Sequence, residues 1–239
     1  MESNLTDKCV WVTGGSEGVG ALLVQELVER HARVVALARQ DDKLQALKSR
    51  FDGKMLIAAV DVSDEKAVEG VFREMDHLQY QPDILINNAG VGSFAHIEET
   101  EVAEWRRMLD VNLTGAFLMS RQAIPRMKAK GGGTILNMNS VAGLHPFRNG
   151  AAYCASKYGL TGLTAVMREE LRKQKIRIIG VHSGAIASSW WEKIPNSENL
   201  PYDHMLQPED VVSSILHALE LPDHAVQEEI VLRYVGGNF

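Results

Sequence analysis

The chain has 239 residues, of which 45% are hydrophobic and 23% charged, a composition typical of a soluble globular protein. Its net charge is −6 and no run of Lys and Arg exceeds two residues, which argues against a nucleic-acid-binding surface. No stretch of about eighteen apolar residues predicts a membrane span, and Cys9 and Cys154 lack the spacing of a metal or redox site.

Short aliphatic runs alternate with longer amphipathic segments along the chain. The runs that predict strands are residues 8–13, 33–38, 54–60, 84–87, 134–138, 176–182 and 229–233. The segments that predict helices include residues 21–31, 43–50, 65–78, 102–130 and 152–173. Most of the strand runs are continuously apolar, as in parallel strands that are covered by helices on both faces.

This alternation of strands and helices predicts an α/β fold. We expect a Rossmann-type doubly wound parallel sheet of about seven strands with helices on both faces. No linker rich in Pro, Gly or Ser divides the chain, and no internal repeat is present. The sequence therefore predicts a single domain that spans residues 1–239.

A glycine cluster follows the first predicted strand and opens the first predicted helix. Glycines let the backbone approach a pyrophosphate, and a helix N-terminus offers free N–H groups and the positive end of its dipole. A plain tight turn is the alternative, but the position inside a βαβ unit favours a dinucleotide site. The candidate cofactor contacts in this loop are Gly14, Ser16, Glu17, Gly18, Val19 and Gly20.

The end of the second predicted strand bears on the choice of cofactor. NAD-binding folds usually have an acid here that binds the ribose hydroxyls, whereas this chain has Ala38 followed by Arg39. Arg39 can pair with a 2′-phosphate, so the residues favour NADP and make NAD less favoured. A solvent-facing Arg39 at a strand end is the alternative, and Glu17 adds a negative charge that weakens the preference.

Tyr153 and Lys157 lie four residues apart in a predicted helix. Such positions share one face, so the phenol and the ammonium point the same way. A phenol has a pKa of about 10, and a nearby cation lowers it, which would give a proton-transfer group that works near neutral pH. A solvated pair on a helix surface explains the spacing equally well on its own.

Further motifs lie in a fixed order along the chain. The glycine cluster reads Thr-Gly-x-x-x-Gly-x-Gly from residue 13, Asp61 and Val62 follow the third strand, and Asn-Asn-Ala-Gly spans residues 87–90. With these motifs the chain resembles the short-chain dehydrogenase/reductase family over nearly its whole length. The residues that match the catalytic tetrad of that family are Asn112, Ser140, Tyr153 and Lys157.

The resemblance implies a role for each residue of the tetrad. Tyr153 would protonate a carbonyl oxygen during reduction or take the hydroxyl proton during oxidation. Lys157 would lower the pKa of Tyr153 and bind the nicotinamide ribose. Ser140 would hold the substrate oxygen, and Asn112 would seat a water that links Lys157 to solvent.

The resemblance also implies cofactor contacts beyond the glycine loop. Asp61 and its neighbour Val62 would contact adenine, and residues 88–90, which are Asn88, Ala89 and Gly90, would line the cofactor beside Tyr153 and Lys157. After the sixth strand the family commonly has Pro-Gly-x-x-x-Thr, whereas this chain has Ser in place of Pro at 183, which leaves the loop less fixed. The contacts expected there are Gly184, Ile186 and Ser188.

The segment of about residues 188–207 would set the substrate specificity, by resemblance to the family. Its adjacent Trp190 and Trp191 either cover the substrate or pack beneath the segment or at a subunit contact. Arg148 either binds an acidic group of the substrate or is a solvated loop charge. His182, which ends a strand, is expected to be structural.

We therefore predict an NADP-dependent oxidoreductase that reversibly reduces a ketone or aldehyde to an alcohol. A 3-oxoacyl thioester or 3-hydroxy acid ranks above other small-molecule carbonyl or alcohol substrates, by family analogy alone. The alternative is a non-catalytic dinucleotide-binding redox sensor or regulatory protein.

The setting of the protein is predicted as well. The polar N-terminus lacks the core of a signal peptide and the two cysteines fit a reducing compartment, so we expect a cytoplasmic location. Small residues along the helix of Tyr153 permit close approach of the sheet or another helix, and the family usually pairs this helix and residues 102–130 with a second subunit. Together with an end at residues 235–239 that resembles tetrameric members of the family, the resemblance implies a homo-oligomer, either a dimer or a homotetramer. No metal, membrane or nucleic-acid partner is expected.

Overall fold

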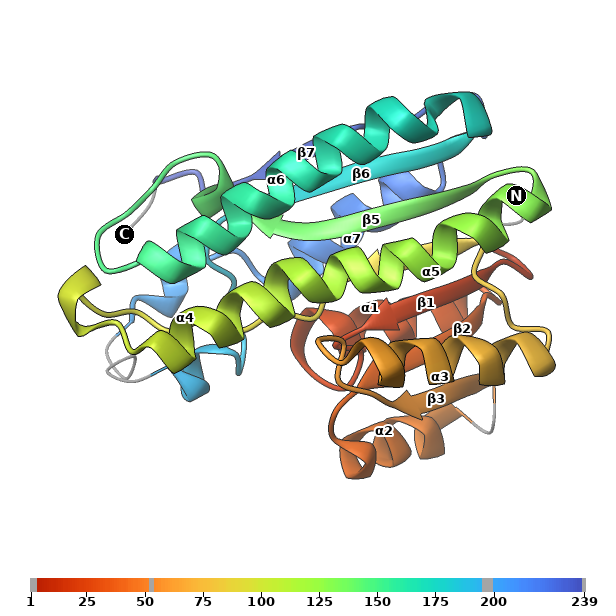
Figure 1. The fold of residues 1–239 in the computed structure, drawn as a ribbon, viewed down its shortest axis with the longest axis horizontal. Helices are drawn as coiled ribbons and strands as arrows, with labels where there is room; N and C mark the ends of the chain where they lie inside the picture. Colours follow the sequence, from red (N-terminus) through yellow and green to blue (C-terminus); the bar gives the residue numbers. More distant parts are fainter. Residues whose placement is uncertain (1–3, 52–53, 195–199, 238–239) are drawn as a thin grey trace.

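The computed structural model describes residues 4–51, 54–194 and 200–237, and its strands form one parallel sheet (Figure 1). The order of the seven strands is β3-β2-β1-β4-β5-β6-β7. The strands are β1 (Cys9–Thr13), β2 (Arg33–Ala38), β3 (Met55–Ala59), β4 (Ile84–Asn87), β5 (Gly133–Ser140), β6 (Ile176–Ser183) and β7 (Glu229–Leu232). The predicted fold class, a Rossmann-type doubly wound parallel sheet, is confirmed.

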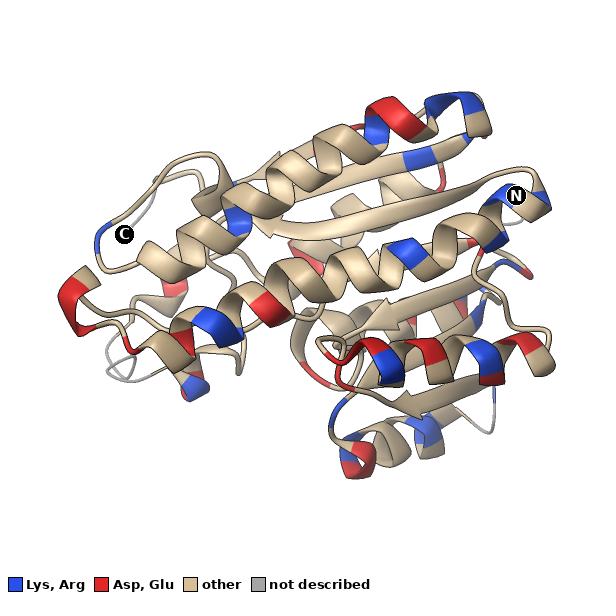
Figure 2. Ribbon diagram, viewed as in Figure 1, with Lys and Arg blue, Asp and Glu red and all other residues tan. Residues whose placement is uncertain are grey.

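Helices cover the sheet on both faces, as Figure 1 shows. One face carries α1 (Gly18–Glu29), α2 (Asp41–Lys48) and α7 (Pro208–Leu219), and the other carries α3 (Glu65–His77), α5 (Gly115–Lys130) and α6 (Ala151–Leu171). Helix α4 (Val102–Leu109) packs against α6. On the outer side of α3, acidic and basic residues alternate (Figure 2). None of the helices in the described part of the chain is long and apolar enough to cross a membrane.

Strand β1 explains why the strand runs are continuously apolar. Val10 and Val12 are buried in the core beneath α1 and α7, whereas Cys9 and Trp11 are buried in the core on the side of α3 and α5. Successive side chains of a strand point to opposite faces, so a sheet with two covered faces needs apolar residues at every position. Trp11 packs against Phe72 of α3 with ring centroids 4.4 Å apart.

The predicted helix over residues 102–130 is not one regular helix. Helix α4 ends at Leu109, a π-helical turn follows at Asp110–Thr114, and α5 begins at Gly115. π-helical turns occur mostly as single turns inside α-helices, and frequently at functional sites. This turn is where Asn112 lies.

The sheet order reverses between β1 and β4, which are neighbours in the middle of the sheet. The connections from these two strands leave toward opposite halves of the sheet, so a crevice opens outside their carboxyl ends. Ligands of doubly wound folds bind at such a switch point. The predicted cofactor and catalytic residues before residue 150 lie at the carboxyl end of a strand or in the connection that follows it.

Candidate active site

Hydrogen bonds tie the carboxyl ends of β1 and β4 together at the crevice. Thr13 Oγ1 accepts from the backbone N–H groups of Asn88 and Ala89, each at 3.0 Å. Asn88 Nδ2 donates to the carbonyl oxygens of Thr13 at 3.0 Å and of Gly14 at 3.2 Å. Asn88 therefore shapes the glycine loop from behind, and its side chain is engaged with protein.

The glycine loop fits the backbone approach that a pyrophosphate requires. Gly14 has a φ of +64°, which favours glycine, and a Cβ on Gly20 would collide with the Gly14 carbonyl and lie 2.6 Å from Asn88 Nδ2. The loop leads into the N-terminus of the twelve-residue α1, whose first N–H groups are free of a side-chain cap. The side chain of Val19 is buried in the core, so only its backbone is available here, while Ser16 and Gly18 are half-buried.

Glu17 is compensated by two lysines. Its Oε2 lies 2.8 Å from Lys43 Nζ, and its Oε1 pairs with Lys193, which belongs to the segment after β6. Burial alone would raise the pKa of Glu17, but the hydrogen bonds and charges of Lys193 and Lys43 hold it below its ordinary value. The negative charge that weakened the preference for NADP is therefore neutralised.

Arg39 and Asp61 follow adjoining strands, β2 and β3. Arg39 is exposed and makes no ion pair with any residue that the structure describes. Asp61 Oδ1 accepts from Ser63 N at 2.9 Å and from Ser63 Oγ at 2.6 Å. Burial would raise the pKa of Asp61, but Ser63 and the charge of Arg39 hold it below its ordinary value. Val62 beside them is buried against Gly115 at the start of α5.

Asn112 joins the loop after β4 to α6. Its Oδ1 accepts from Val91 N at 2.8 Å, and its Nδ2 donates to Val91 O at 2.9 Å and to Ser156 Oγ at 3.0 Å. A Cβ on Gly90 would lie 3.5 Å from Asn112 Oδ1 and 3.8 Å from Lys157 Nζ, so these three residues meet. Both Nδ2 hydrogens are used within the protein, which leaves a free lone pair on Oδ1 for a water.

Tyr153 and Lys157 share one face of α6, as their spacing predicts. Lys157 Nζ lies 5.7 Å from the Tyr153 ring centroid and donates to Met138 O at 2.9 Å. Burial lowers the pKa of Lys157 to about 8, and burial raises the pKa of Tyr153 to about 12 although a hydrogen bond with Ser140 opposes this. Burial thus sets the direction of the Tyr153 pKa shift, and the expectation that Lys157 lowers this pKa stays a prediction.

Ser140 ends β5 directly before a short 3₁₀ turn, Val141–Gly143. Its Oγ accepts from Ala142 N at 3.1 Å, and its backbone N–H donates to Asn139 Oδ1 at 2.9 Å. These bonds hold the serine at the strand end, where its hydroxyl reaches Tyr153. The structure thus brings together all the residues of the predicted tetrad.

Aromatic rings surround Tyr153 on the side of the crevice. Its ring centroid lies 5.7 Å from that of Phe94, 6.1 Å from Trp190 and 6.4 Å from Phe147. Trp190 also meets Trp191 edge to face, with centroids 4.9 Å apart. Sequence reasoning missed Phe94, although it lies only four residues after Gly90 at the end of the Asn-Asn-Ala-Gly motif, which is a usable signal.

Hydrogen bonds fix the loop after β6 where the family has proline. Gly184 N donates to Leu232 O at 2.8 Å, and Trp191 Nε1 donates to Ile186 O at 2.9 Å. The Ile186 carbonyl is thus engaged, and only its N–H remains for a cofactor. A Cβ on Gly18 would lie 4.0 Å from Ser188 Cβ, so this loop reaches the glycine loop. Residues 195–199 of the expected substrate segment lie outside the described residues.

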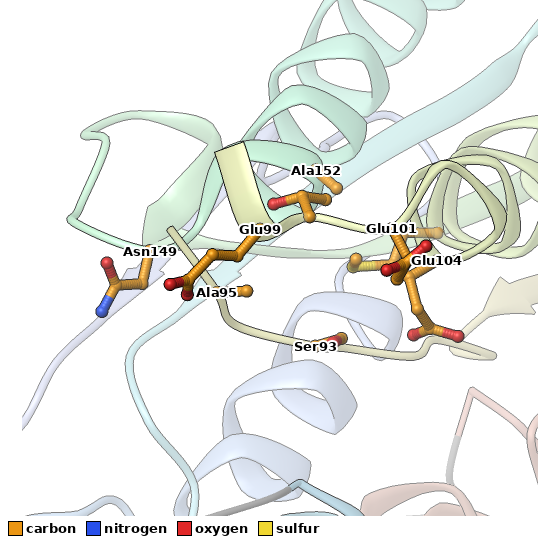
Figure 3. A pocket seen from close by; sticks show the side chains of 9 residues that line it. Ser93, Ala95, Glu99, Glu101, Glu104, Asn149 and Ala152 are labelled. Carbon is orange, nitrogen blue, oxygen red and sulfur yellow. The ribbon is translucent and has the colours of Figure 1, made fainter. Parts of the chain in front are cut away.

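Two pockets lie next to the aromatic rings. Figure 3 shows the first, in which carboxylates face a hollow between α4 and the start of α6; its lining residues are Ser93, Ala95, Glu99, Thr100, Glu101, Glu104, Met108, Asn149 and Ala152. The second is lined by residues 95–98, Phe147, Arg148, Asn149 and Ala151, and it shares Ala95 and Asn149 with the first. Arg148 therefore lies in the wall of the second pocket.

Comparisons with known proteins agree with this geometry. The family profile described as short chain dehydrogenase matches residues 8–199. Trans-4-hydroxycyclohexanecarboxylate dehydrogenase from Sinomonas cyclohexanicum is 33% identical over 195 residues, which cover 78% of this chain and 75% of that protein. Glycine betaine reductase ATRR from Emericella nidulans is 32% identical over 237 residues, which cover 95% of this chain but only 19% of that protein. The chain thus spans less than a fifth of the length of this second relative.

Solved structures share the whole fold. The closed form of serine dehydrogenase complexed with NADP⁺ is 25% identical and has a TM-score of 0.90, with 96% of each chain covered. A metagenomic short-chain oxidoreductase in complex with NADP is 32% identical and has a TM-score of 0.84, with 97% of this chain and 98% of that chain covered.

Proposed function

The chain belongs to the short-chain dehydrogenase/reductase family, and on that premise we propose that it is an NADP-dependent oxidoreductase that reversibly reduces a ketone or aldehyde to an alcohol. The observation that carries this proposal is the meeting of Ser140, Tyr153 and Lys157 beside a glycine loop shaped for a pyrophosphate. A non-catalytic sensor would need the glycine loop but not the buried phenol.

In this mechanism Tyr153 is the acid of the reduction. A bound nicotinamide cofactor supplies the hydride. The raised pKa of about 12 keeps the phenol protonated near pH 7, which is the form that reduction needs. Ser140 Oγ holds the substrate oxygen beside the phenol and stabilises the negative charge that develops there.

Lys157 then restores the proton on Tyr153. Its pKa of about 8 keeps it mostly charged at pH 7 yet close to the pH at which it can release a proton. Its Nζ is anchored on Met138 O and lies beside Gly90 and Asn112. A water on the free lone pair of Asn112 Oδ1 would connect this ammonium to solvent, and the ribose of the cofactor would bind the same ammonium.

Three observations support NADP over NAD. Arg39 is exposed after β2 and has no ion-pair partner among the described residues, so it is available for a 2′-phosphate. The negative charge of Glu17, which would oppose binding of the extra phosphate, is neutralised by Lys43 and Lys193. Two similar solved structures are complexes with NADP. Asp61, Val62 and residues 88–90 complete the cofactor contacts in this proposal.

For the substrate we propose a small carbonyl compound whose apolar part lies among the rings around Tyr153. A 3-oxoacyl thioester or hydroxy-acid type of substrate ranks first, and the name of the Sinomonas relative, a hydroxycarboxylate dehydrogenase, supports the hydroxy-acid class. Trp190 and Phe94, with the rest of segment 188–207, would set the size limit.

We further propose that the protein is a homo-oligomer, a dimer or tetramer, in the cytoplasm. Large apolar side chains are exposed on neighbouring helices of one face: Trp105 on α4, Phe117 on α5, and Tyr158 and Val166 on α6. Apolar residues exposed together in this way mark protein interfaces. A monomeric mass by light scattering at micromolar concentration would contradict the oligomer.

The enzyme and the sensor are separated by one assay. NADPH absorbance is followed with a panel of ketones, aldehydes and 3-oxoacyl thioesters, with wild type beside Tyr153→Phe. Turnover by wild type, with loss in the variant while NADPH binding persists, supports the enzyme. NADPH binding without turnover on any compound supports the sensor.

A further inference from the structure

His182 lies buried beside the catalytic serine and outside the tetrad. It is the last residue but one of β6, is 2% exposed, and pairs in register with Asn139, the neighbour of Ser140. Its Nε2 lies 2.8 Å from Glu229 Oε2 and its Nδ1 lies 3.3 Å from the Ser140 carbonyl oxygen. The ring therefore connects β7 to the end of β5.

Both neighbours of the ring are hydrogen-bond acceptors. A neutral imidazole carries one N–H group and one nitrogen lone pair, so it would direct a lone pair at either the carboxylate or the carbonyl. The imidazolium has two N–H groups and donates to both. The two contacts are therefore satisfied together only when both ring nitrogens carry hydrogen.

The carboxylate that the ring faces is held in place from its other side as well. Arg168 Nη2 holds the other oxygen of Glu229 at 2.8 Å, so the carboxylate is fixed between two donors. Burial would raise the pKa of Glu229, but His182 and Arg168 hold it below its ordinary value, and the group stays ionised. A side chain at Gly180 would collide with the Glu229 carboxylate, so the glycine makes room for the pair. Glu228 also pairs with Arg168, at 3.6 Å, but does not contact the ring.

We propose that His182 is a positioning residue for the proposed reduction: as an imidazolium anchored on Glu229, it holds the Ser140 carbonyl and thereby aims Ser140 Oγ at the substrate oxygen beside Tyr153. The inference rests on the proposed function. Without the anchor, the ring no longer needs a hydrogen on both nitrogens, so a lone pair can face the Ser140 carbonyl and loosen the strand end that carries the hydroxyl.

The test compares Glu229→Gln with Glu228→Gln. Both variants remove one carboxylate that pairs with Arg168, but only the first touches the His182 ring. We expect kcat to fall about tenfold in Glu229→Gln, with the KM for NADPH unchanged, because a misplaced catalytic group slows the chemical step. Glu228→Gln should keep the wild-type kcat. Equal kcat values in the two variants would overturn the inference.

A double-mutant cycle distinguishes positioning from general damage. In the Ser140→Ala background, Glu229→Gln should lower kcat no further, since the hydroxyl that it aims is gone. The same tenfold loss in that background would show that the effect bypasses Ser140 and would contradict the role. If Glu229→Gln fails to fold, His182→Gln, which retains a donor, against His182→Phe gives the same comparison, with partial activity expected only in the former.

A readout without turnover keeps the inference separate from the proposed function. ¹⁵N spectra of the histidine rings at pH 7, assigned with His182→Gln, should show two protonated nitrogens for His182. One protonated nitrogen would overturn the inference even if the enzyme is active. If no carbonyl compound is turned over, the proposed function is refuted, while the spectra still report the protonation of the His182 ring.

Discussion

The two halves of the crevice handle charge in different ways. At the ends of β1, β2 and β3, charged side chains lie near the surface, and one of them, Glu17, is compensated by Lys43 and Lys193. At the ends of β4 and β5, Lys157 is only 5% exposed, and no acidic side chain in the described residues pairs with it. Substitution of an exposed, compensated charge changes the free energy little, whereas the free energy of a buried charge depends strongly on each group that contacts it. In the proposed function, the first half would therefore tune cofactor choice and the second would carry the chemistry.

The largest expected effect is in the buried half. Tyr153→Phe removes the proton donor and should lower kcat by about 10²- to 10⁴-fold, while NADPH affinity measured by fluorescence changes little. The matched control is Tyr158→Phe on the same helix, whose exposed hydroxyl donates only to Leu144 O. Equal activity of both variants would refute Tyr153 as the acid.

The next effect tests the backbone of the cofactor half. Gly20→Ala places a methyl group against the Gly14 carbonyl, and we expect NADPH affinity to fall about 10- to 100-fold from this overpacking. Gly162→Ala in α6 meets open space and should leave affinity unchanged while stabilising the fold by about 0.5–1 kcal/mol. Titration of both variants with NADPH measures the difference, and wild-type affinity in Gly20→Ala would contradict the close approach.

A third prediction concerns the pH dependence of stability. The pKa of Lys157 is about 8 when folded and returns toward its ordinary, higher value on unfolding, so above pH 8 the unfolded chain binds more protons. Stability from this group should therefore rise with pH, by about 2 kcal/mol between pH 8 and 10. Urea unfolding of wild type and of Lys157→Met between pH 8 and 10 isolates this contribution, because the free energy of unfolding of wild type should rise relative to that of the variant. The same pH dependence in both proteins would show that Lys157 is not buried as a charge.

The smallest effect is expected at the exposed arginine. Ala38→Asp with Arg39→Ile should shift the ratio of kcat/KM for NADPH over NADH toward NADH by about tenfold, through loss of a charge-assisted phosphate contact and gain of a ribose acceptor. Arg50→Ile, which removes another exposed arginine after α2, serves as the control. An unchanged ratio in the double variant would defeat the NADP assignment.

The sequence predicts the strands to within a residue or two, because continuous apolar runs end where the chain leaves the sheet. It predicts the grouping of Ser140, Tyr153 and Lys157 because the motif spacing of the family carries them. It does not predict the π-helical turn at Asn112, since residues 102–130 are a single amphipathic segment without an internal break signal that marks the turn.

The remaining features depend on contacts between distant parts of the chain. The direction of the Tyr153 pKa shift follows from burial, which only the packed structure determines. The pairing of Glu17 with Lys193 joins residues 176 positions apart. The bond of His182 to the Ser140 carbonyl likewise joins two strands that are adjacent only in the folded sheet.

The central claim is that this crevice transfers a hydride to a carbonyl carbon, with the proton supplied from Tyr153. The most direct measurement uses NADPH deuterated at the transferable C4 position and mass spectrometry of the alcohol from the best substrate of the panel. The account predicts one deuterium on the carbinol carbon for each NADPH oxidised by wild type, and about 10²- to 10⁴-fold less labelled alcohol in the same time with Tyr153→Phe. Oxidation of NADPH without label in the alcohol, or equal labelling by the variant, would contradict it.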